Sequence, residues 1–435
     1  MEYYSTKRQS PIVGLRDAVI DCMPSDGGLY MPEALPVIPK AFINNMPDMN
    51  LREIAYVTTN MFLGSDVDSA TLKKIVDESM NFEVPLVRLS DRRYALELFH
   101  GPTMAFKDFG AMFMSRLAQS FNPHDGTKLN VLVATTGNTG AAVAKGFSEA
   151  PDVNVFVLYP QNHRLPDMYP RLIDVGSNVH AVEVGGSIDD CKAMVSAAFA
   201  DAALREKLLL TSANSVNFAR LMPQLALFFY AYAQLMSAGA DASAADIALP
   251  SGNLGMLTAG LLARRAGLTC GRLIAACNAN NTFDVLMKTG RLVKRPTVST
   301  LARFMDMSMP SNLPRLMNLC DDDTSRLRGE VDSASVSDQL IEQTISRTYE
   351  MTGYQTEPHA AVGLAALDMR SDAERPGVVF ATAHPALSRR TVERLTGCSV
   401  AGAKTAEKAT SAPTGKAVKL PATYPALRKY LLANQ

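Results

Sequence analysis

The sequence predicts an α/β protein whose parallel sheets are covered by helices on both faces. Short runs rich in Val, Ile and Leu alternate with helix-like segments through residues 129–385, and these runs are continuously apolar. Such runs are typical of parallel strands buried between layers of helices, whereas half-exposed strands alternate apolar and polar residues. The chain has 435 residues, more than a single hydrophobic core usually supports, so we expect two or three domains.

Five apolar runs are the predicted strands, and three of them end in turns of small and polar residues. The runs are LNVLVA (129–134), VNVFVLYP (153–160), DIALP (246–250), GRLIAACN (271–278) and GVVFA (377–381). The first, third and fifth lead into ATTGNTGAA, PSGNLG and ATAHP, and helices are predicted at 141–147 and 256–266. Open parallel sheets bind ligands at the carboxyl ends of their strands. These three turns are therefore the candidate site.

The two ends of the chain differ from this alternating pattern. Residues 1–90 contain the amphipathic segments NLREIAYVTTNMFLG and SATLKKIVDESM with no strand predicted between them, so we expect a helical N-terminal region. Residues 401–435 begin with an Ala/Thr/Lys-rich stretch, which predicts an exposed linker, and end with a predicted small helix at 424–432.

Composition and patterning exclude several classes of function. Lys plus Arg and Asp plus Glu number 43 each, so no excess charge favours nucleic acid or an anionic membrane. The N-terminus lacks the apolar core of a secretory signal, and the uncharged stretch 221–240 contains Pro223 and two glutamines, which favours a buried helix over a membrane span. Six cysteines without a CxxC pair and six histidines without a metal-ligand spacing predict reduced thiols, a cytoplasmic protein and no metal site.

The segment ELFHGPTMAFKDF places Lys107 among apolar and small residues. Flanking side chains such as Phe106 and Phe109 can remove the amine from water, which lowers its pKa and makes it a nucleophile at neutral pH. The alternative is a lysine at a turn, with Asp108 as a solvated neighbour.

Two of the three turns are candidate anion-binding sites. PSGNLG supplies free backbone N–H groups at a predicted helix start, which suits a phosphate, although an ordinary βα turn has the same composition. ATTGNTGAA adds the side-chain donors of Thr135, Thr136, Asn138 and Thr139. His384 of ATAHP, taken singly, favours a structural role. Two anion turns and an apolar-flanked lysine together predict a site for a phosphorylated aldehyde that forms a Schiff base, and pyridoxal phosphate is the obvious candidate.

Eight sequence blocks, in this order, resemble the threonine synthase family of pyridoxal-phosphate enzymes in its long bacterial and fungal form. They are YYSTKRQSP, SDGGLYMP, FHGPTMAFKDFG, ATTGNTGAAVAKGF, TSANSVNFARLMPQ, PSGNLGMLTAGLLA, TGYQTEPHAAVG and ATAHPA, and they span nearly the whole chain. The resemblance implies the tryptophan-synthase-β-like fold, also called fold type II, with two open and mostly parallel sheets. With this fold we expect a small α/β domain at 128–222, a large cofactor-binding domain at 91–127 and 223–400, and a monomer or homodimer.

The resemblance also implies roles for individual residues. Lys107 carries the cofactor through a Schiff base, Asn138 lies near the cofactor's phenolic oxygen, and Thr382 faces its pyridine nitrogen. The cofactor phosphate is wrapped by Gly252, Asn253, Leu254 and Gly255. The small-molecule substrate is bound by Thr135, Thr136, Thr139, Asn214, Ser215 and Arg220. The implied reaction converts O-phosphohomoserine and water into threonine and phosphate, with Lys107 also acting as general base.

Several positions that are usually basic or small in this family differ here. Ala111 and Met112 stand where the family has Gly and Arg, Gln161 and His163 replace two basic residues, and Leu387 occupies a lysine position. Each lost cation removes a charge-assisted hydrogen bond of about 1.5–3 kcal/mol.

These differences keep two alternatives to a threonine synthase open. One is a paralogue that uses pyridoxal phosphate to act on another amino acid, by elimination or β-replacement. The other is a non-catalytic cofactor-binding protein. Retention of Lys107 disfavours the second alternative, because a scaffold needs no Schiff-base amine.

Overall fold

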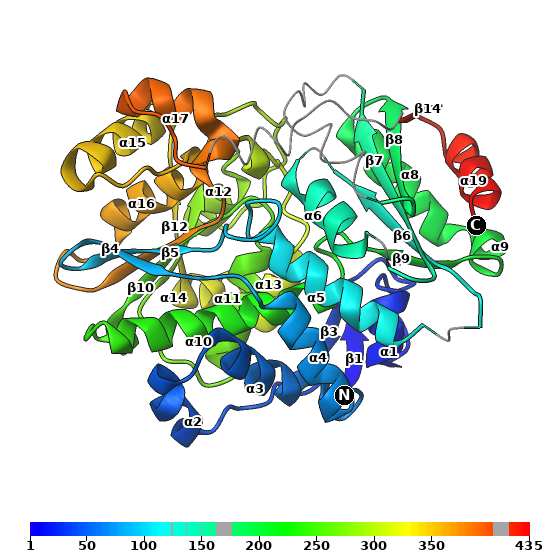
Figure 1. The fold of residues 1–435 in the computed structure, drawn as a ribbon, viewed down its shortest axis with the longest axis horizontal. Helices are drawn as coiled ribbons and strands as arrows, with labels where there is room; N and C mark the ends of the chain where they lie inside the picture. The colour runs from blue at the N-terminus through cyan, green and yellow to red at the C-terminus, as the bar shows by residue number, and fades with distance from the viewer. Residues whose placement is uncertain (123–124, 136, 149, 162–175, 403–416) are drawn as a thin grey trace.

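The structure is a computed structural model of the 435-residue chain and describes residues 1–122, 125–135, 137–148, 150–161, 176–402 and 417–435. Two lobes are visible in Figure 1, and each contains its own mostly parallel sheet. The N-terminal region lies below them in this view. The α/β class predicted from the apolar runs is confirmed.

The larger sheet has six strands in the order β12-β11-β10-β13-β5-β4. They are β4 (Leu86–Ser90), β5 (Arg93–Glu97), β10 (Asp246–Pro250), β11 (Leu273–Cys277), β12 (Val331–Ser335) and β13 (Gly377–Ala381). Neighbouring strands run parallel except β4 and β5, which form an antiparallel hairpin at one edge. Helices α15 (Asp338–Thr352) and α16 (Pro358–Arg370) pack on one face, and α10 (Leu221–Ser237) and α11 (Gly255–Arg265) on the other.

The smaller sheet has five parallel strands in the order β14-β8-β7-β6-β9. They are β6 (Leu129–Ala134), β7 (Val153–Pro160), β8 (Val179–Gly185), β9 (Leu209–Ser212) and β14 (Val418–Pro421). Helix α6 (Asn138–Phe147), with α5 (Lys107–Ser120) against it, covers one face, and α8 (Ile188–Ala200) and α19 (Tyr424–Ala433) cover the other.

Burial on both faces explains why the predicted strands have continuous apolar runs. In β6, Val131 and Val133 belong to the main core beneath α6, whereas Leu132 points into the core beneath α8. In β11, Ala275 faces the main core and Ile274 faces the core beneath α16. Each successive side chain of these central strands is therefore removed from water.

The N-terminal region differs from the expected helical region, because it also contains a three-stranded antiparallel sheet in the order β2-β1-β3. Its elements are β1 (Glu2–Ser5), β2 (Val13–Gly14), α1 (Leu15–Ile20), β3 (Tyr30–Pro32), α2 (Lys40–Asn45), η1 (Met46–Asp48), α3 (Leu51–Leu63) and α4 (Ser69–Ser79). Strands of two to four residues are too short to show a period in the sequence. The predicted helices are present as α3 and α4, and the domain limits stay predictions.

The C-terminal segment, predicted as a linker and a helix, also contains a β-strand. Strand β14 extends the smaller sheet beside β8, and α19 packs against α8. Most of the predicted linker, 403–416, lies outside the described residues. The remaining elements are α9 (Ala202–Arg205), η2 (Phe218–Arg220), η3 (Ala242–Ala244), α12 (Thr282–Thr289), η4 (Arg303–Met305), α13 (Leu313–Leu319), α14 (Thr324–Glu330), η5 (Pro385–Ser388) and α17 (Arg389–Thr396).

The uncharged segment 221–240 forms α10, a helix with most of its residues buried between α3 and α11. No helix of the described ranges has both the length and the apolar character that a membrane span requires. All six cysteines are free thiols, as the sequence predicted.

Candidate cofactor-binding site

Lys107 is the first residue of α5, and the loop before it is bonded to the loop after β13. The N–H of Phe106 donates to the carbonyl of Thr382 at 2.9 Å, and the N–H of His384 donates to the carbonyl of Met104 at 3.0 Å. Lys107 and Thr382 come from distant parts of the sequence, and these bonds bring them to the same edge of the larger sheet. The pairing agrees with the predicted location of the site at the carboxyl ends of strands.

Asp108, in the first turn of α5, organises the loop that carries the lysine. Its carboxylate accepts from the N–H of Thr103 at 2.8 Å and from the hydroxyl of Thr103 at 2.5 Å. Asp108 is 1% exposed, so the alternative interpretation, a lysine at a turn with a solvated Asp108 as neighbour, is wrong. A carboxylate at a helix N-terminus is favoured by the helix dipole, and here it also bonds the loop to the helix.

The Lys107 amine lies near one aromatic ring and is affected by one guanidinium group. The Lys107 Nζ atom lies 4.9 Å from the centre of the Phe106 ring. Burial, with a further contribution from the Arg220 guanidinium, lowers the pKa of Lys107 to about 7. A neutral lysine amine is a nucleophile, so Lys107 becomes reactive at a lower pH than an ordinary lysine does.

This pKa predicts how covalent cofactor attachment depends on pH. The fraction of neutral amine rises as pH rises through the pKa, so we expect the attachment rate of added pyridoxal phosphate to apoprotein to increase up to pH of about 7 and then level off. Stopped-flow measurement of the cofactor's visible absorbance at several pH values checks this. A rate that continues to increase up to pH of about 10, as for an ordinary lysine, would contradict it.

The turn after β6 positions Asn138 at the start of α6. The Thr135 Oγ1 atom accepts from the N–H groups of Gly137 and Gly140, each at 3.1 Å, and shapes the turn from within. Asn138 is 4% exposed, and its Oδ1 atom has no hydrogen-bond partner among the described residues. A buried amide oxygen without a partner costs about 1–3 kcal/mol unless a ligand or water serves it. Thr139 follows in the first turn of α6, and Thr136 lies outside the described residues.

The turn after β10 has the backbone geometry of an anion cradle. Leu254 has φ of 62°, the left-handed region that non-glycine residues rarely adopt, and it directly precedes α11. A Cβ atom added at Gly252 would lie 2.9 Å from the Cα and O atoms of Met305, so only glycine fits there. A left-handed residue at a helix start aims successive N–H groups into one concavity, where the helix dipole also favours an anion. Gly255 begins the helix.

The Asn253 side chain holds this turn in place. Its amide group donates to the hydroxyl of Ser215, and its Oδ1 atom accepts from the N–H of Ser311 at 2.7 Å. The Asn253 carbonyl accepts from the side chain of Asn312 at 3.2 Å. The side chain of Asn253 therefore stabilises the turn. Only the backbone N–H of Asn253 is then suited to the predicted contact with the cofactor phosphate.

Three residues predicted to bind substrate contact the protein itself. The Asn214 side chain pairs with both backbone groups of Ala134, at 3.1 and 3.0 Å, and holds the end of β6. Ser215 accepts from Asn253. Arg220 is 2% exposed, its guanidinium donates to the carbonyl of Ala213, and its Nε atom has no acceptor among the described residues. Their contacts with substrate stay predictions.

A turn that the sequence analysis did not identify connects the two glycine-rich turns. A Cβ atom added at Gly137 would lie 2.7 Å from the ring of Phe304 in η4, and the next residue, Met305, is the one that packs on Gly252. The N–H of Phe304 donates to the Nε2 atom of His359 at 3.1 Å, and the two rings stack with their centres 5.2 Å apart. The EPHAA block that contains His359 was the only sequence signal for this contact.

At positions 112, 161 and 387, where the family usually has basic residues, the structure has uncharged side chains. Met112 lies in α5 and Leu387 in η5, both partly buried, and Gln161 follows β7. His163 lies outside the described residues.

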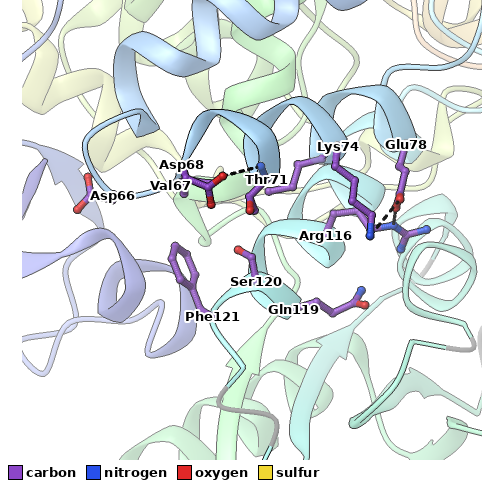
Figure 2. Close-up of a pocket in the computed structure, with 11 residues that line it drawn as sticks. Asp66, Val67, Asp68, Thr71, Lys74, Glu78, Arg116, Gln119, Ser120 and Phe121 are labelled. Atoms are coloured by element: carbon purple, nitrogen blue, oxygen red, sulfur yellow. Dashed lines mark hydrogen bonds and ion pairs between the residues drawn. The ribbon is translucent and has the colours of Figure 1, made fainter.

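The opposite end of α5 carries a polar groove of about 470 Å³ (Figure 2). It lies between α4 and α5, and the Arg116 Nε atom donates to the carboxylate of Glu78 at 2.7 Å across it. Arg116 also donates to the carbonyl of Gly146 at 3.2 Å, so it joins α4, α5 and α6. Nine residues separate Arg116 from Lys107, about 13 Å along a helix, so this groove is distinct from the site.

The described groups fit the chemical demands of pyridoxal phosphate. A buried amine of lowered pKa suits its aldehyde, a left-handed turn at a helix start suits its phosphate, and the unpartnered amide of Asn138 suits a polar atom of its ring. Thr382 is 7% exposed and lies beside the Lys107 loop, and its position near the cofactor ring stays a prediction.

Comparison with known proteins supports the same cofactor. Residues 84–382 match the model of the family described as pyridoxal-phosphate dependent enzyme, and residues 2–80 match the model described as threonine synthase N terminus. The threonine synthase of Haemophilus influenzae is 35% identical over 434 residues, which cover all of both chains.

Solved structures agree with the sequence matches. The threonine synthase of Escherichia coli superposes with a TM-score of 0.93 at 34% identity, covering 100% of each chain. The PLP-bound threonine synthase of Brucella melitensis gives a TM-score of 0.90 at 28% identity, covering 100% of this chain and 99% of the other. The predicted fold type II and the predicted cofactor class are confirmed. The chain belongs to the threonine synthase family of pyridoxal-phosphate dependent enzymes.

Proposed function

We propose that this protein converts O-phosphohomoserine and water into threonine and phosphate. Family membership over the full length supports the reaction, and the observation that carries it is the buried amine of Lys107, whose pKa is lowered to about 7 and whose loop is bonded to the loop after β13. A cytoplasmic location and a monomeric or homodimeric state are part of this proposal.

Pyridoxal phosphate would be held by Lys107, by the backbone of the Gly252–Gly255 turn and by Asn138. When bound, the cofactor withdraws electrons from the substrate's α-carbon and so acidifies the protons on neighbouring carbons. The Thr382 hydroxyl beside its ring is uncharged, which would leave the ring nitrogen less protonated than an aspartate would.

Lys107 has the properties of the general base that this reaction needs. Its Nζ atom, whose pKa is lowered to about 7, can accept a proton from a substrate carbon and later return it. Arg220 favours the neutral amine, because a nearby positive charge disfavours a second one. Asp108 stabilises the charge of Arg220 by raising the pKa of the guanidinium against the lowering effect of burial.

Uncharged Met112 and Leu387 favour a second candidate function. A pocket with fewer cations binds a phosphate dianion less tightly, which suits a paralogue that acts on an unphosphorylated amino acid by elimination or β-replacement.

One experiment separates the two reactions. We expect purified holoenzyme to release phosphate from O-phosphohomoserine and to form an equal amount of threonine, measured by a phosphate assay and by amino-acid analysis. Serine and threonine, assayed in parallel for keto-acid formation, are expected to react slowly by comparison. Fast keto-acid formation without phosphate release would overturn the proposed function and support the paralogue.

A further inference from the structure

The turn η4 lies against both glycine-rich turns of the site. The Phe304 ring packs on Gly137 of the turn after β6, and the backbone of Met305 packs on Gly252 of the turn after β10. A Cβ atom added at Gly137 would lie 2.7 Å from the Phe304 ring, and one added at Gly252 would lie 2.9 Å from the Cα and O atoms of Met305. Because neither contact leaves free space, a displacement of η4 also displaces the two turns.

The start of α16 supports η4 from behind. His359 is 3% exposed, and its Nε2 atom accepts from the N–H of Phe304 at 3.1 Å. The two rings stack with their centres 5.2 Å apart and their planes at 10°. Glu357, the N-cap residue of α16, is 1% exposed, and its carboxylate lies 2.5 Å from the Nδ1 atom of His359. Carboxylate, imidazole and turn thus form one buried hydrogen-bonded series.

One proton arrangement of the neutral imidazole satisfies this series. The N–H of Phe304 can only donate, so Nε2 of His359 must present its lone pair. The proton is then on Nδ1 and is donated to the carboxylate of Glu357, which can only accept. That carboxylate also accepts from the N–H groups of His359 and Ala360, at 3.0 and 2.8 Å, which fixes it at the helix start. Glu357 therefore selects the form of His359 that holds Phe304.

The other end of η4 is held by Asp306. Its carboxylate accepts from the side chain of Asn278 at 2.8 Å and from the N–H of Thr300 at 3.0 Å. A turn fixed at both ends can hold its neighbours with the precision that a ligand site requires.

The two turns that η4 contacts are the ones that offer groups to the cofactor. Asn138, next to Gly137, is 4% exposed, and its Oδ1 atom has no hydrogen-bond partner among the described residues. Leu254, two residues after Gly252, has φ of 62° and precedes α11, whose N-terminus suits a phosphate. The contacts of η4 therefore set how the Asn138 amide lies relative to the turn after β10.

We infer that Glu357 and His359 are positioning residues for pyridoxal phosphate, which hold η4 against the two glycine-rich turns and so fix the spacing between them. This inference rests on the proposed function only in that these turns hold the cofactor, and it does not depend on the substrate. In metal sites, residues that orient the ligating groups without touching the metal change its affinity by about 10- to 100-fold when they are replaced. We expect an effect of that size here.

The test measures cofactor affinity and stability in the full-length protein. Purified holoenzyme is freed of cofactor and titrated with pyridoxal phosphate, followed by visible absorbance, and circular dichroism gives the urea midpoint of the same apoprotein. His359→Phe keeps a ring that can stack on Phe304 and removes the acceptor, so it is expected to weaken pyridoxal phosphate by about 10- to 100-fold. His359→Gln places an amide oxygen within reach of the Phe304 N–H and is expected to recover most of this loss.

The role of Glu357 is tested through His359. Glu357→Ala removes the acceptor of Nδ1 and lets the imidazole carry its proton on Nε2, where it would face the N–H of Phe304. This variant is expected to weaken pyridoxal phosphate by about 10-fold in the wild-type background and by less than about 2-fold in the His359→Phe background. Equal effects in the two backgrounds would overturn the assignment of Glu357.

Ser333→Ala is the matched control for stability. It removes a buried hydrogen bond from β12, where the Ser333 hydroxyl bonds to Asp284 at 2.8 Å. We expect it to lower the urea midpoint and to bind pyridoxal phosphate as the wild type does. A His359→Phe protein that loses stability but binds the cofactor as this control does would overturn the inference, because the pair would then act only in folding.

Asp306→Asn tests η4 from its other end and is the deciding variant if His359→Phe does not fold. Asparagine keeps the shape of aspartate but has one oxygen to serve Asn278 and Thr300, so it is expected to weaken pyridoxal phosphate by about 3- to 10-fold. Wild-type affinity in this variant would then overturn the inference.

These outcomes are separate from the test of the proposed function. A wild-type protein that releases no phosphate from O-phosphohomoserine would refute the proposed function, and the cofactor titrations would still decide the role of Glu357 and His359. A wild-type protein that binds no pyridoxal phosphate would overturn the inference itself.

Discussion

Replacement of Lys107 with alanine is expected to abolish turnover, with kcat reduced by about 10⁴-fold or more. The substitution removes the amine that holds the cofactor covalently and the general base that moves the substrate's protons. Its pKa of about 7 makes it suited to both tasks at neutral pH. The visible absorbance lost on borohydride reduction measures covalent attachment of the cofactor, and phosphate release from O-phosphohomoserine measures turnover.

The control for this experiment is Lys145→Ala, which removes an exposed lysine from α6. It is expected to retain activity, a reducible chromophore and wild-type stability. Full activity in Lys107→Ala would refute the catalytic role of Lys107. An inactive Lys107→Ala protein with an unchanged reducible chromophore would show that another amine holds the cofactor.

Replacement of Arg315 with methionine is expected to lower the free energy of unfolding by about 3–5 kcal/mol. Arg315 is 0% exposed and donates to the carbonyls of Tyr30, Ser215 and Val216, at 3.2, 3.1 and 2.6 Å, and to the side chain of Asn312 at 2.8 Å. Methionine fills similar space but removes the donor from four acceptors, two of them buried and two partly buried.

The same substitution is expected to weaken cofactor binding, because two of these acceptors belong to residues that contact Asn253. Ser215 accepts from the Asn253 amide, and Asn312 donates to the Asn253 carbonyl. Loss of Arg315 thus removes support from both residues, Ser215 and Asn312, that hold Asn253 in the turn after β10. Urea unfolding followed by circular dichroism measures the stability, and titration of apoprotein with pyridoxal phosphate measures the affinity.

Arg16→Met is the matched control for Arg315→Met. The Arg16 side chain is 51% exposed and pairs only with its neighbour Asp17 among the described residues, so its loss is expected to change stability by less than about 0.5 kcal/mol. A urea midpoint for Arg315→Met equal to that of this control would contradict the structural role of Arg315.

The sequence predicted the interior strands that have continuous apolar runs, and it missed the edge strands as well as the partly exposed interior strands β5 and β8. Strands β6, β7, β10, β11 and β13 are mostly buried on both faces, so their apolar runs were continuous and visible. Strands β4 and β14, at the sheet edges, have partly exposed side chains. Strand β12 is the polar segment VDSAS, whose Ser333 hydroxyl bonds to Asp284 at 2.8 Å, and a buried serine gives no apolar signal.

In the candidate site, too, features that depend on neighbouring residues in the sequence were predicted, and contacts between distant segments were not. Lys107 was predictable because its neighbours in the sequence are the side chains that remove it from water. Phe304 and His359 were not predicted, because the contact of Phe304 with Gly137 joins residues far apart in the chain. The alternative with a solvated Asp108 could not be excluded from the sequence for the same reason, since burial of a side chain depends on the packing of distant elements.

By itself, the sequence determined the α/β class, the strands with continuous apolar runs and the family, and it predicted Lys107 as the cofactor lysine, because each is expressed in residues that adjoin along the chain. Only the tertiary structure decided which groups surround that lysine. It placed Arg220 beside Lys107 and η4 between the two glycine-rich turns, and it made Arg315 a buried donor to distant carbonyls. Such contacts form when segments separated in sequence pack together, and their energies depend on burial and geometry that the order of residues does not express.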